Sequence, residues 1–233
     1  MITEIKNALD SIKCGKGKPW FASSEFARLA VNGGFELTIR DRLLEPLHQE
    51  FQKQSNSISV ISEYSQHGFK GKPTKKGTFQ SLRADIGIVD GPLCPPYKGK
   101  TKAIIELKTN FSSQFGDIKS RAMADWDKWD KARKARSDGI CWGLIYNITD
   151  ITSPNMHGAY FPKYTTKHPV AIKDIESFFS AFAKKENLAF QWMGPQKSSC
   201  KYSGCSSLYL DTYFAICVFC RGPRQSHTQM SWE

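Results

Sequence analysis

Apolar side chains recur in the N-terminal part of the chain at the spacing of a helix. From Phe35 to Phe51 an apolar residue stands at every fourth position, which predicts one face of an amphipathic helix. Pro46 lies inside this pattern and predicts a kink or a restart of the helix there. An earlier helix is expected to begin at Ser23 and Ser24 and to end at the Asn-Gly-Gly turn of residues 32–34.

Further along the chain, short apolar runs predict strands, and two more helical patterns lie among them. The strands are expected at residues 58–64, 86–89, 102–108 and 140–146, near 188–193 and near 207–219. The helices are expected at residues 117–136 and near 172–185. Residues 65–83 contain five Lys or Arg and no acid, which predicts an exposed basic loop. Helices that flank a central mixed sheet define an α/β or α+β fold.

The size and charge of the chain narrow this picture. Its 233 residues suit one domain, which we place at residues 1–195, followed by a Cys-rich extension at residues 196–233. A formal net charge of +11 predicts an anionic partner and excludes an acidic, solvating protein. The first residues lack the apolar core of a signal peptide, and no apolar run is long enough to span a bilayer. We therefore expect a cytoplasmic protein that does not contact a membrane.

Two acidic residues and a lysine are predicted to meet at one end of a strand pair. If the strands at 86–89 and 102–108 are antiparallel neighbours, the start of the first lies beside the end of the second. Asp85 then lies near Glu106 and Lys108, which share one face because side chains alternate along a strand. The apolar face of the second strand is expected to pack on the helix that follows it. The alternative interpretation is that Asp85 caps a turn and the other two residues form a solvated ion pair.

These residue types suit the hydrolysis of a phosphodiester. Mg²⁺ prefers hard oxygen ligands and keeps several waters, so Asp85, Glu106 and the backbone carbonyl of Leu107 would form a partial coordination shell. The metal would lower the pKa of a bound water, and Lys108 would orient that water and stabilise the charge on the phosphate. Lys108 would act as a general base only if its pKa were lowered.

On Ala84-Asp85 and Glu106-Leu107-Lys108 the sequence resembles the PD-(D/E)xK nuclease superfamily, the fold of many restriction endonucleases. The resemblance covers the order of elements over residues 23–147. It implies a central mixed sheet flanked by helices, and a Mg²⁺-dependent cleavage of double-stranded DNA in which Asp85, Glu106 and Lys108 are catalytic. Ala84 departs from the pattern, because a proline often precedes this aspartate in the family.

The resemblance also implies a fourth acidic residue. Family members often place a glutamate from the first long helix near the metal. In this sequence that glutamate is Glu36, which opens the predicted helix, with Glu45 and Glu50 as alternatives.

Four cysteines near the C-terminus form two closely spaced pairs. Cys200 and Cys205 are separated by four residues, and Cys217 and Cys220 by two, a pattern that predicts a structural Zn²⁺ site. The alternative is that Cys217 is a small core residue in an apolar run. The odd total of seven cysteines, without an export signal, predicts thiols or metal ligands rather than disulfides, and Cys141 is expected to be an ordinary thiol.

Basic and polar residues around the predicted site are expected to contact DNA. In the basic loop they are Lys70, Lys72, Lys75, Lys76 and Arg83; after the second motif strand, Asn110, Ser112, Ser113 and Gln114; and at the start of the next helix, Lys119 and Arg121. Trp126 and Trp129 continue the apolar stripe of that helix, so they are expected in the core rather than stacked on bases.

Three functions are compatible with these features. The leading one is a type II restriction endonuclease, located with the nucleoid when bound to DNA, and a homodimer if its target is palindromic. The second is a nuclease with the same chemistry that recognises DNA structure in repair or recombination. The third is a zinc-stabilised nucleic-acid-binding module without catalysis.

Overall fold

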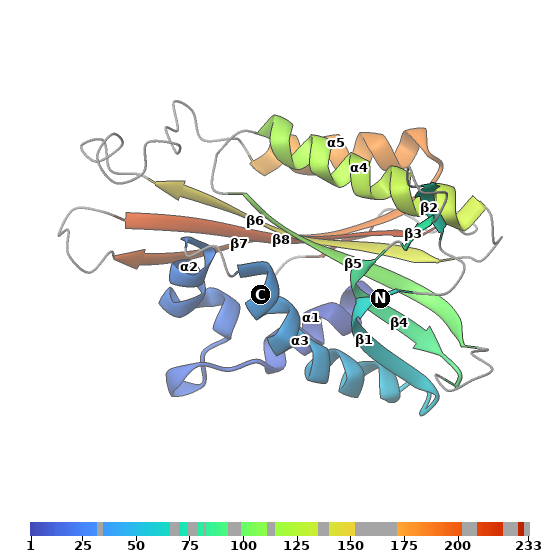
Figure 1. Ribbon diagram of the computed structural model, residues 1–233. Helices are drawn as coiled ribbons and strands as arrows, with labels where there is room; N and C mark the ends of the chain where they lie inside the picture. Colours follow the sequence, from blue (N-terminus) through green and yellow to red (C-terminus); the bar gives the residue numbers. More distant parts are fainter. Residues whose placement is uncertain are drawn as a thin grey trace.

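The computed structural model describes most of the chain (Figure 1). The described residues are 1–31, 35–65, 70–73, 79–81, 83–92, 99–110, 115–134, 140–151, 172–201, 209–220 and 228–230.

A seven-stranded, mostly antiparallel sheet forms the centre of the protein. In spatial order its strands are β1 (Ile58–Tyr64), β4 (Ala84–Asp90), β5 (Lys100–Asn110), β6 (Cys141–Ile151), β8 (Tyr209–Cys220), β7 (Ala189–Lys201) and β9 (Thr228–Met230). The β5–β6 and β7–β9 pairs are parallel, and the other neighbours are antiparallel. The fold is therefore mixed α/β, as the alternation of patterns predicted.

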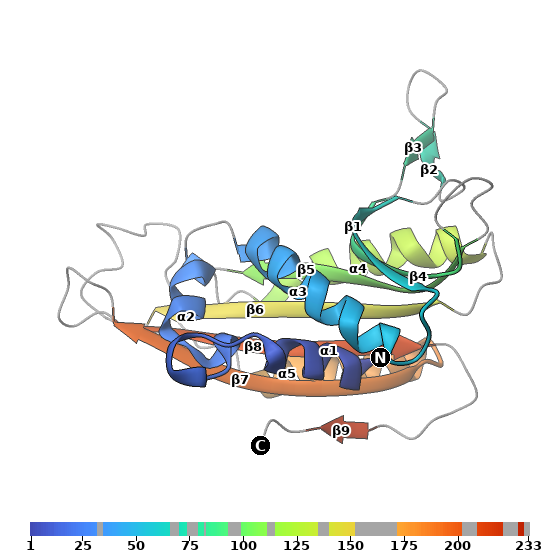
Figure 2. The same ribbon diagram turned by 90° about the horizontal axis from the view of Figure 1, so that it is seen from below.

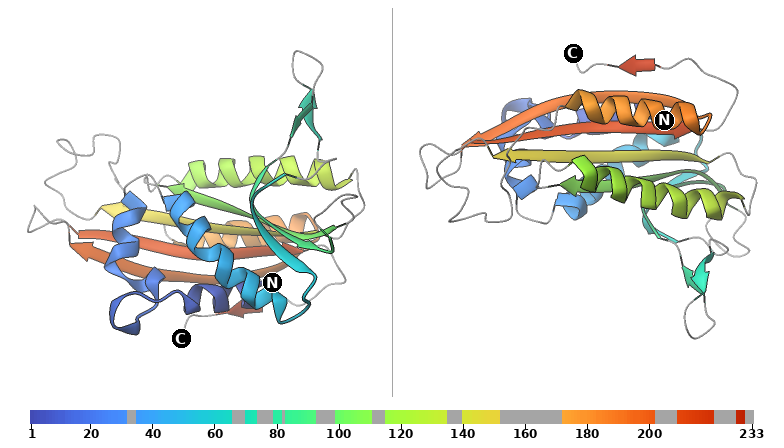
Figure 3. Two further views of the ribbon diagram at one scale, coloured as in Figure 1. Left: turned by 60° about the horizontal axis from the view of Figure 1, so that its bottom comes forward. Right: turned by 90° about the horizontal axis from the view of Figure 1, so that it is seen from above.

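Helices cover both faces of the sheet (Figure 1). One face carries α1 (Ile2–Ser11), α2 (Ser24–Val31) and α3 (Phe35–Gln52), with short 3₁₀ turns at Gly15–Gly17 and Trp20–Ala22. The opposite face carries α4 (Phe115–Lys134) and α5 (Ile172–Lys185). Seen from above, α4 runs along β5 and α5 along β7 (Figure 3). Helix α1 and strand β9 had not been predicted.

The first helices follow the sequence signals closely. The Ser23 hydroxyl accepts a hydrogen bond from the Phe26 backbone amide at 3.2 Å, so Ser23 caps the N-terminus of α2 as expected. Helix α3 spans Phe35–Gln52 without a break and contains Pro46, so the restart predicted at this proline does not occur. The apolar residues of α3 are buried in the core, and the stability gained by burying them outweighs the cost of a proline inside the helix.

Strand β5 has two different faces. Ala103, Ile105 and Leu107 are buried in a core with α1, α2 and α3, whereas Ile104 lies in the core on the side of α4 and α5. We expected the apolar face of this strand to pack on the helix that follows it, and this expectation was wrong. The helix α4 covers the other face, which also carries Glu106.

Two expectations about chain organisation also need correction. Residues 65–83 are not a loop throughout, because β2 (Lys70–Pro73) and β3 (Phe79–Ser81) pair as a separate two-stranded sheet. This hairpin projects from the end of β1 (Figure 2). The boundary placed between residues 195 and 196 falls inside β7, and β8 lies between β6 and β7 in the main sheet. Residues 196–201 of β7 and all of β8 are therefore part of the central sheet and not of a separate C-terminal extension.

None of the helices in the described part of the chain is long and apolar enough to cross a membrane.

Candidate active site

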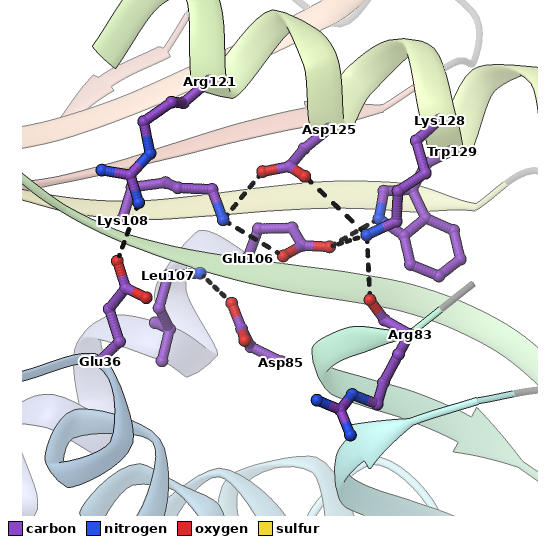
Figure 4. A network of polar contacts seen from close by, with 10 residues as sticks. All are labelled: Glu36, Arg83, Asp85, Glu106, Leu107, Lys108, Arg121, Asp125, Lys128 and Trp129. Carbon is purple, nitrogen blue, oxygen red and sulfur yellow. Dashed lines mark hydrogen bonds and ion pairs between the residues drawn. The ribbon is translucent and has the colours of Figure 1, made fainter. Parts of the chain in front are cut away.

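Asp85 and Glu106 lie where strands β4 and β5 separate. The two strands pair in antiparallel register up to Ile86 and Ile105, so the next residues on each strand are Asp85 and Glu106. There the Asp85 carboxylate takes the place of a strand partner, because its Oδ2 accepts a hydrogen bond from the Leu107 backbone amide at 2.7 Å (Figure 4). The predicted antiparallel pairing of these strands, with Asp85 at the start of one and Glu106 near the end of the other, is confirmed.

Glu106 is almost completely buried beneath α4. Its side chain is 4% exposed, and its Oε1 accepts a hydrogen bond from the Trp129 indole Nε1 at 2.7 Å. The Lys128 Nζ lies 3.4 Å from the same oxygen, and the Lys108 Nζ lies 3.5 Å from Oε2 (Figure 4). Burial raises the pKa of Glu106 from 4.5 to about 7, and the neighbouring Asp125 adds to this rise while Lys108 and Lys128 oppose it.

Lys108 points from β5 toward α4, where its nearest acidic partner is Asp125. Its Nζ lies 2.8 Å from Asp125 Oδ2, closer than the 3.5 Å to Glu106 Oε2. Burial lowers the pKa of Lys108, but the negative charges of Glu106 and Asp125 raise it more, so the net pKa lies above 10.5. Lys108 is therefore a cation at neutral pH and does not meet the condition set for a general base.

Helix α4 supplies residues of the site that sequence reasoning did not assign. Asp125 contacts Lys108, and both Lys128 and Trp129 contact Glu106. Their spacing along the helix places them on one face, and this is the signal that could have identified them. Acidic and basic residues alternate in this segment, so its charges were interpreted as neutralising one another on the surface, and this signal was missed. Trp126 and Trp129 are buried as predicted, and Trp129 also donates the hydrogen bond to Glu106.

Glu36 lies at the start of α3 and contacts α4. Its Oε1 is 3.5 Å from the Arg121 guanidinium, and both side chains are about 40% exposed (37% and 41%). The contacts drawn in Figure 4 join Glu36 to Arg121 and do not join it to Asp85 or Glu106. Whether Glu36 takes part in chemistry stays a prediction.

The other predicted DNA contacts fall partly on described residues. Arg83 is exposed, its guanidinium pairs with Glu63, and its backbone carbonyl accepts a hydrogen bond from Lys128 Nζ at 3.0 Å. The backbones of Lys70 and Lys72 lie in β2, of Asn110 in β5 and of Lys119 in α4, but their side chains are outside the described part. Lys75, Lys76, Ser112, Ser113 and Gln114 lie wholly outside the described residues.

The oxygen atoms of this site suit a hard divalent cation. Mg²⁺ takes one or two protein carboxylates and completes its octahedron with water and phosphate oxygens, so Asp85 and Glu106 are of the ligand type that this ion prefers. Both Glu106 oxygens also contact side chains of the protein, Oε1 those of Trp129 and Lys128 and Oε2 that of Lys108. Burial and the acidic residues around Glu106 raise its pKa, because both make its negative charge unfavourable. A bound cation would stabilise that charge. Over the described ranges, no cluster of three or more His, Cys, Asp or Glu residues is arranged to hold a metal ion.

The cysteines whose side chains the structure describes do not fit the predicted four-cysteine zinc site. Cys220 forms a disulfide with Cys141, its neighbour on the antiparallel strand β6, with Cα atoms 4.4 Å apart. Cys217 is fully buried in the core on the other face of the sheet, and burial raises the pKa of its thiol well above the usual value. Cys217 pairs with Trp192 on β7, and Cys200 lies eight residues further along that strand. At the rise per residue of a β-strand this is roughly 25 Å away.

These positions correct three predictions. Cys141 is not a free thiol, Cys220 is not a free ligand, and Cys217 is the core residue that we considered as the alternative. A strand places residues three positions apart on opposite faces, which is why the close spacing in sequence was misleading. Cys205 lies outside the described residues.

Comparisons of the chain with known protein families, with curated proteins and with solved structures find no significant match.

Proposed function

We propose that this protein is a Mg²⁺-dependent endonuclease of the PD-(D/E)xK type that hydrolyses phosphodiester bonds in double-stranded DNA. One observation carries the proposal. Asp85 and Glu106 flank the point where two antiparallel strands separate, and Lys108 on the same face as Glu106 lies 3.5 Å from its carboxylate. The alternative, a turn cap beside a solvated ion pair, is disfavoured because the Glu106 side chain is buried and the Lys108 side chain is only 14% exposed.

The order of elements supports the same proposal. Helix α3 precedes the strands that carry the motif, α4 follows them, and helices cover both faces of a mixed sheet (Figure 1). These are the features that the resemblance to restriction endonucleases implies. A net charge of +11 favours a polyanionic substrate, whose binding would be sensitive to salt.

The proposed roles follow from the positions of the side chains. Asp85 and Glu106 would hold Mg²⁺, which supplies an activated water and offsets negative charge on the phosphate. Lys108 keeps its proton and would donate to a phosphate oxygen, stabilising the charge that develops there. Asp85 also fixes the Leu107 backbone through the hydrogen bond to its amide, which keeps the Leu107 carbonyl in place at the edge of the site.

The test is digestion of a mixed phage and plasmid DNA panel, methylated and unmethylated, with Mg²⁺. EDTA and the variants Lys108→Ala and Asp85→Ala are run alongside. We expect both variants to lose at least roughly 10³-fold in cleavage rate while they remain folded by circular dichroism. Lys102→Ala is the matched control, since Lys102 lies on the same strand but pairs with Asp90 at the far end of the hairpin.

The products distinguish the candidate functions. Discrete, Mg²⁺-dependent bands would identify a sequence-specific endonuclease, and a palindromic site would indicate a homodimer. A smear or nicking would retain the active site and favour a structure-directed nuclease. A folded protein that binds DNA but cleaves neither panel would refute the proposal, as would wild-type cleavage by Lys108→Ala.

A further inference from the structure

The lysine of the site is held by a residue outside the sequence motif. Asp125 lies on α4, opposite β5, and its Oδ2 is 2.8 Å from the Lys108 Nζ (Figure 4). Both side chains are largely buried, at 18% exposed for Asp125 and 14% for Lys108. A pair this well shielded from water is not a loose surface ion pair, so the contact restricts where the ammonium group can lie.

Asp125 also contacts the second lysine of the site. Its Oδ1 lies 3.8 Å from the Lys128 Nζ, which in turn is 3.4 Å from Glu106 Oε1. Two lysines and two carboxylates therefore alternate, with Lys108 between Asp125 and one oxygen of Glu106, and Lys128 between Asp125 and the other oxygen. The cluster connects α4 to β5.

The two distances to Lys108 show which acid lies nearer to its ammonium group. The ammonium is 0.7 Å closer to Asp125 than to Glu106, from the 2.8 Å and 3.5 Å separations. A lysine side chain has a long, flexible stem, and its single charge moves readily toward the strongest partner within reach. If Asp125 lost its charge, Glu106 would be the remaining acid in contact with Lys108 among the contacts described here, and the ammonium would move toward it.

We propose that Asp125 is a positioning residue that holds the Lys108 ammonium away from Glu106 and in line with the substrate phosphate. This inference rests on the proposed nuclease function. Asp125 acts through Lys108 and does not touch the substrate itself. Without it, Lys108 would pair with Glu106, leave the position where it meets the phosphate and compete with a cation for the Glu106 carboxylate.

The test compares Asp125→Asn and Asp125→Ala with the wild-type protein in single-turnover cleavage over a range of Mg²⁺ concentrations. Asp127→Asn is the matched control, because Asp127 is an exposed acid two residues along the same helix. DNA binding is measured by fluorescence anisotropy in EDTA, and folding by circular dichroism. Asp125→Ala keeps the experiment informative if Asp125→Asn does not fold.

We expect the maximal cleavage rate of both variants to fall roughly 100-fold, the scale of a misplacement of about 1 Å. DNA affinity should stay within about twofold, because a phosphate-contacting charge has not been removed. Asp125→Glu retains the charge and should recover part of the rate. Asp127→Asn should behave as the wild type.

Three results would overturn the inference. The first is a wild-type rate in a folded Asp125→Asn or Asp125→Ala protein. The second is an unchanged maximal rate reached only at higher Mg²⁺, which would show that Asp125 affects metal affinity and does not position Lys108 for the reaction. The third is a loss of DNA affinity equal to the loss of rate, which would make it a binding residue. If the wild-type protein itself does not cleave, the proposed function fails and the inference falls with it, so the two failures are recognised separately.

Discussion

Neighbouring residues on the two faces of strand β5 are both buried but differ in chemistry. Ile105 and Leu107 face α1 and α3 in a wholly apolar core, and Ile105 is 0% exposed. One position away, Glu106 is 3% exposed and faces α4 through a network of charges. The apolar face contributes stability through burial and packing. On the polar face, charged side chains are buried, and their ion-pair partners offset only part of the free energy lost by removing these charges from water.

This difference indicates how the molecule separates folding from chemistry. Burying carboxylates and amines beside one another is costly, so such a cluster is not explained by a need for stability. It is explained if the charges must be held ready for a reaction, with the apolar face of the same strand keeping the backbone rigid. The comparison predicts that substitutions on the apolar face lower stability with little effect on activity, and that substitutions on the polar face lower activity even where they raise stability.

The largest effect on stability is expected on the apolar face. Ile105→Ala should lower the free energy of unfolding by about 2–5 kcal/mol, since it removes a buried side chain and leaves a cavity. The measurement is urea unfolding in EDTA, followed by circular dichroism. Cleavage per folded molecule should stay near the wild-type rate. A stability loss below about 0.5 kcal/mol would contradict the assignment of Ile105 to the core.

The next effect should come from Glu106 and should depend on pH. Its pKa is about 7 in the folded protein and 4.5 when unperturbed, so the folded state retains a proton that the unfolded state releases. The stability of the wild-type protein should therefore decline as pH rises from about 4.5 to about 7 and then level off. Glu106→Gln should remove this decline, which makes the variant more stable than wild type by about 3 kcal/mol at pH 8 and nearly equal to it at pH 4.

Urea unfolding in EDTA at several pH values between 4 and 8 measures this difference. Glu50→Gln, on α3, is a control that should not reproduce it, because hydrogen bonds from Lys53 and Asn7 lower the pKa of Glu50. Parallel pH curves for wild type and Glu106→Gln would show that the pKa of Glu106 is the same in the folded and unfolded states and would contradict the prediction. Despite its greater stability, Glu106→Gln should lose cleavage.

A smaller effect is expected from the hydrogen bond between α4 and Glu106. Trp129→Phe removes the indole donor that lies 2.7 Å from Oε1 and should cost about 1–3 kcal/mol in the free energy of unfolding. Trp126→Phe is the matched control, because Trp126 packs on Trp142 and Phe182 in the same core. Thermal and urea unfolding of both variants isolate the contribution of the hydrogen bond. Equal losses would mean that only packing matters.

The smallest effect should come from Glu36, the fourth acid suggested by the family resemblance. Its contact with Arg121 is partly exposed, and such pairs contribute about 0–1 kcal/mol. We expect Glu36→Gln to leave stability almost unchanged and to lower the cleavage rate less than tenfold, in contrast to Asp85→Ala. A loss as large as that of Asp85→Ala would instead place Glu36 in the reaction.

Much of the fold and the centre of the site could be predicted because they depend on local patterns. The apolar period of α3 and the runs that form β1, β4, β5 and β6 are strong signals of element type. The turn at Asp90-Gly91 made an antiparallel neighbour of the next strand the simplest arrangement, and this brought Asp85 to Glu106.

The remainder could not be predicted, because it depends on contacts between distant segments. Asp125 and Trp129 are remote in sequence from Asp85. Their spacing places them on one face of α4, but only the packing of α4 on β5 turns this face toward Glu106 and Lys108. The pairing of Cys141 with Cys220 spans 79 residues and follows from the register of β6 with β8. The short spacing of Cys217 and Cys220 in the sequence suggested that both bind one Zn²⁺ ion, although the geometry of a strand places them on opposite faces.

The sequence by itself determined which residues of β5 share a face, since side chains alternate on any strand. It also determined most of the helical and extended segments and the basic charge of the chain. Only the tertiary structure decided that α4 covers the face with Glu106 and Lys108, and that α1 and α3 cover the face with Ile105. That choice depends on how the layers pack together, and it sets the burial and charge partners of Glu106 and Lys108.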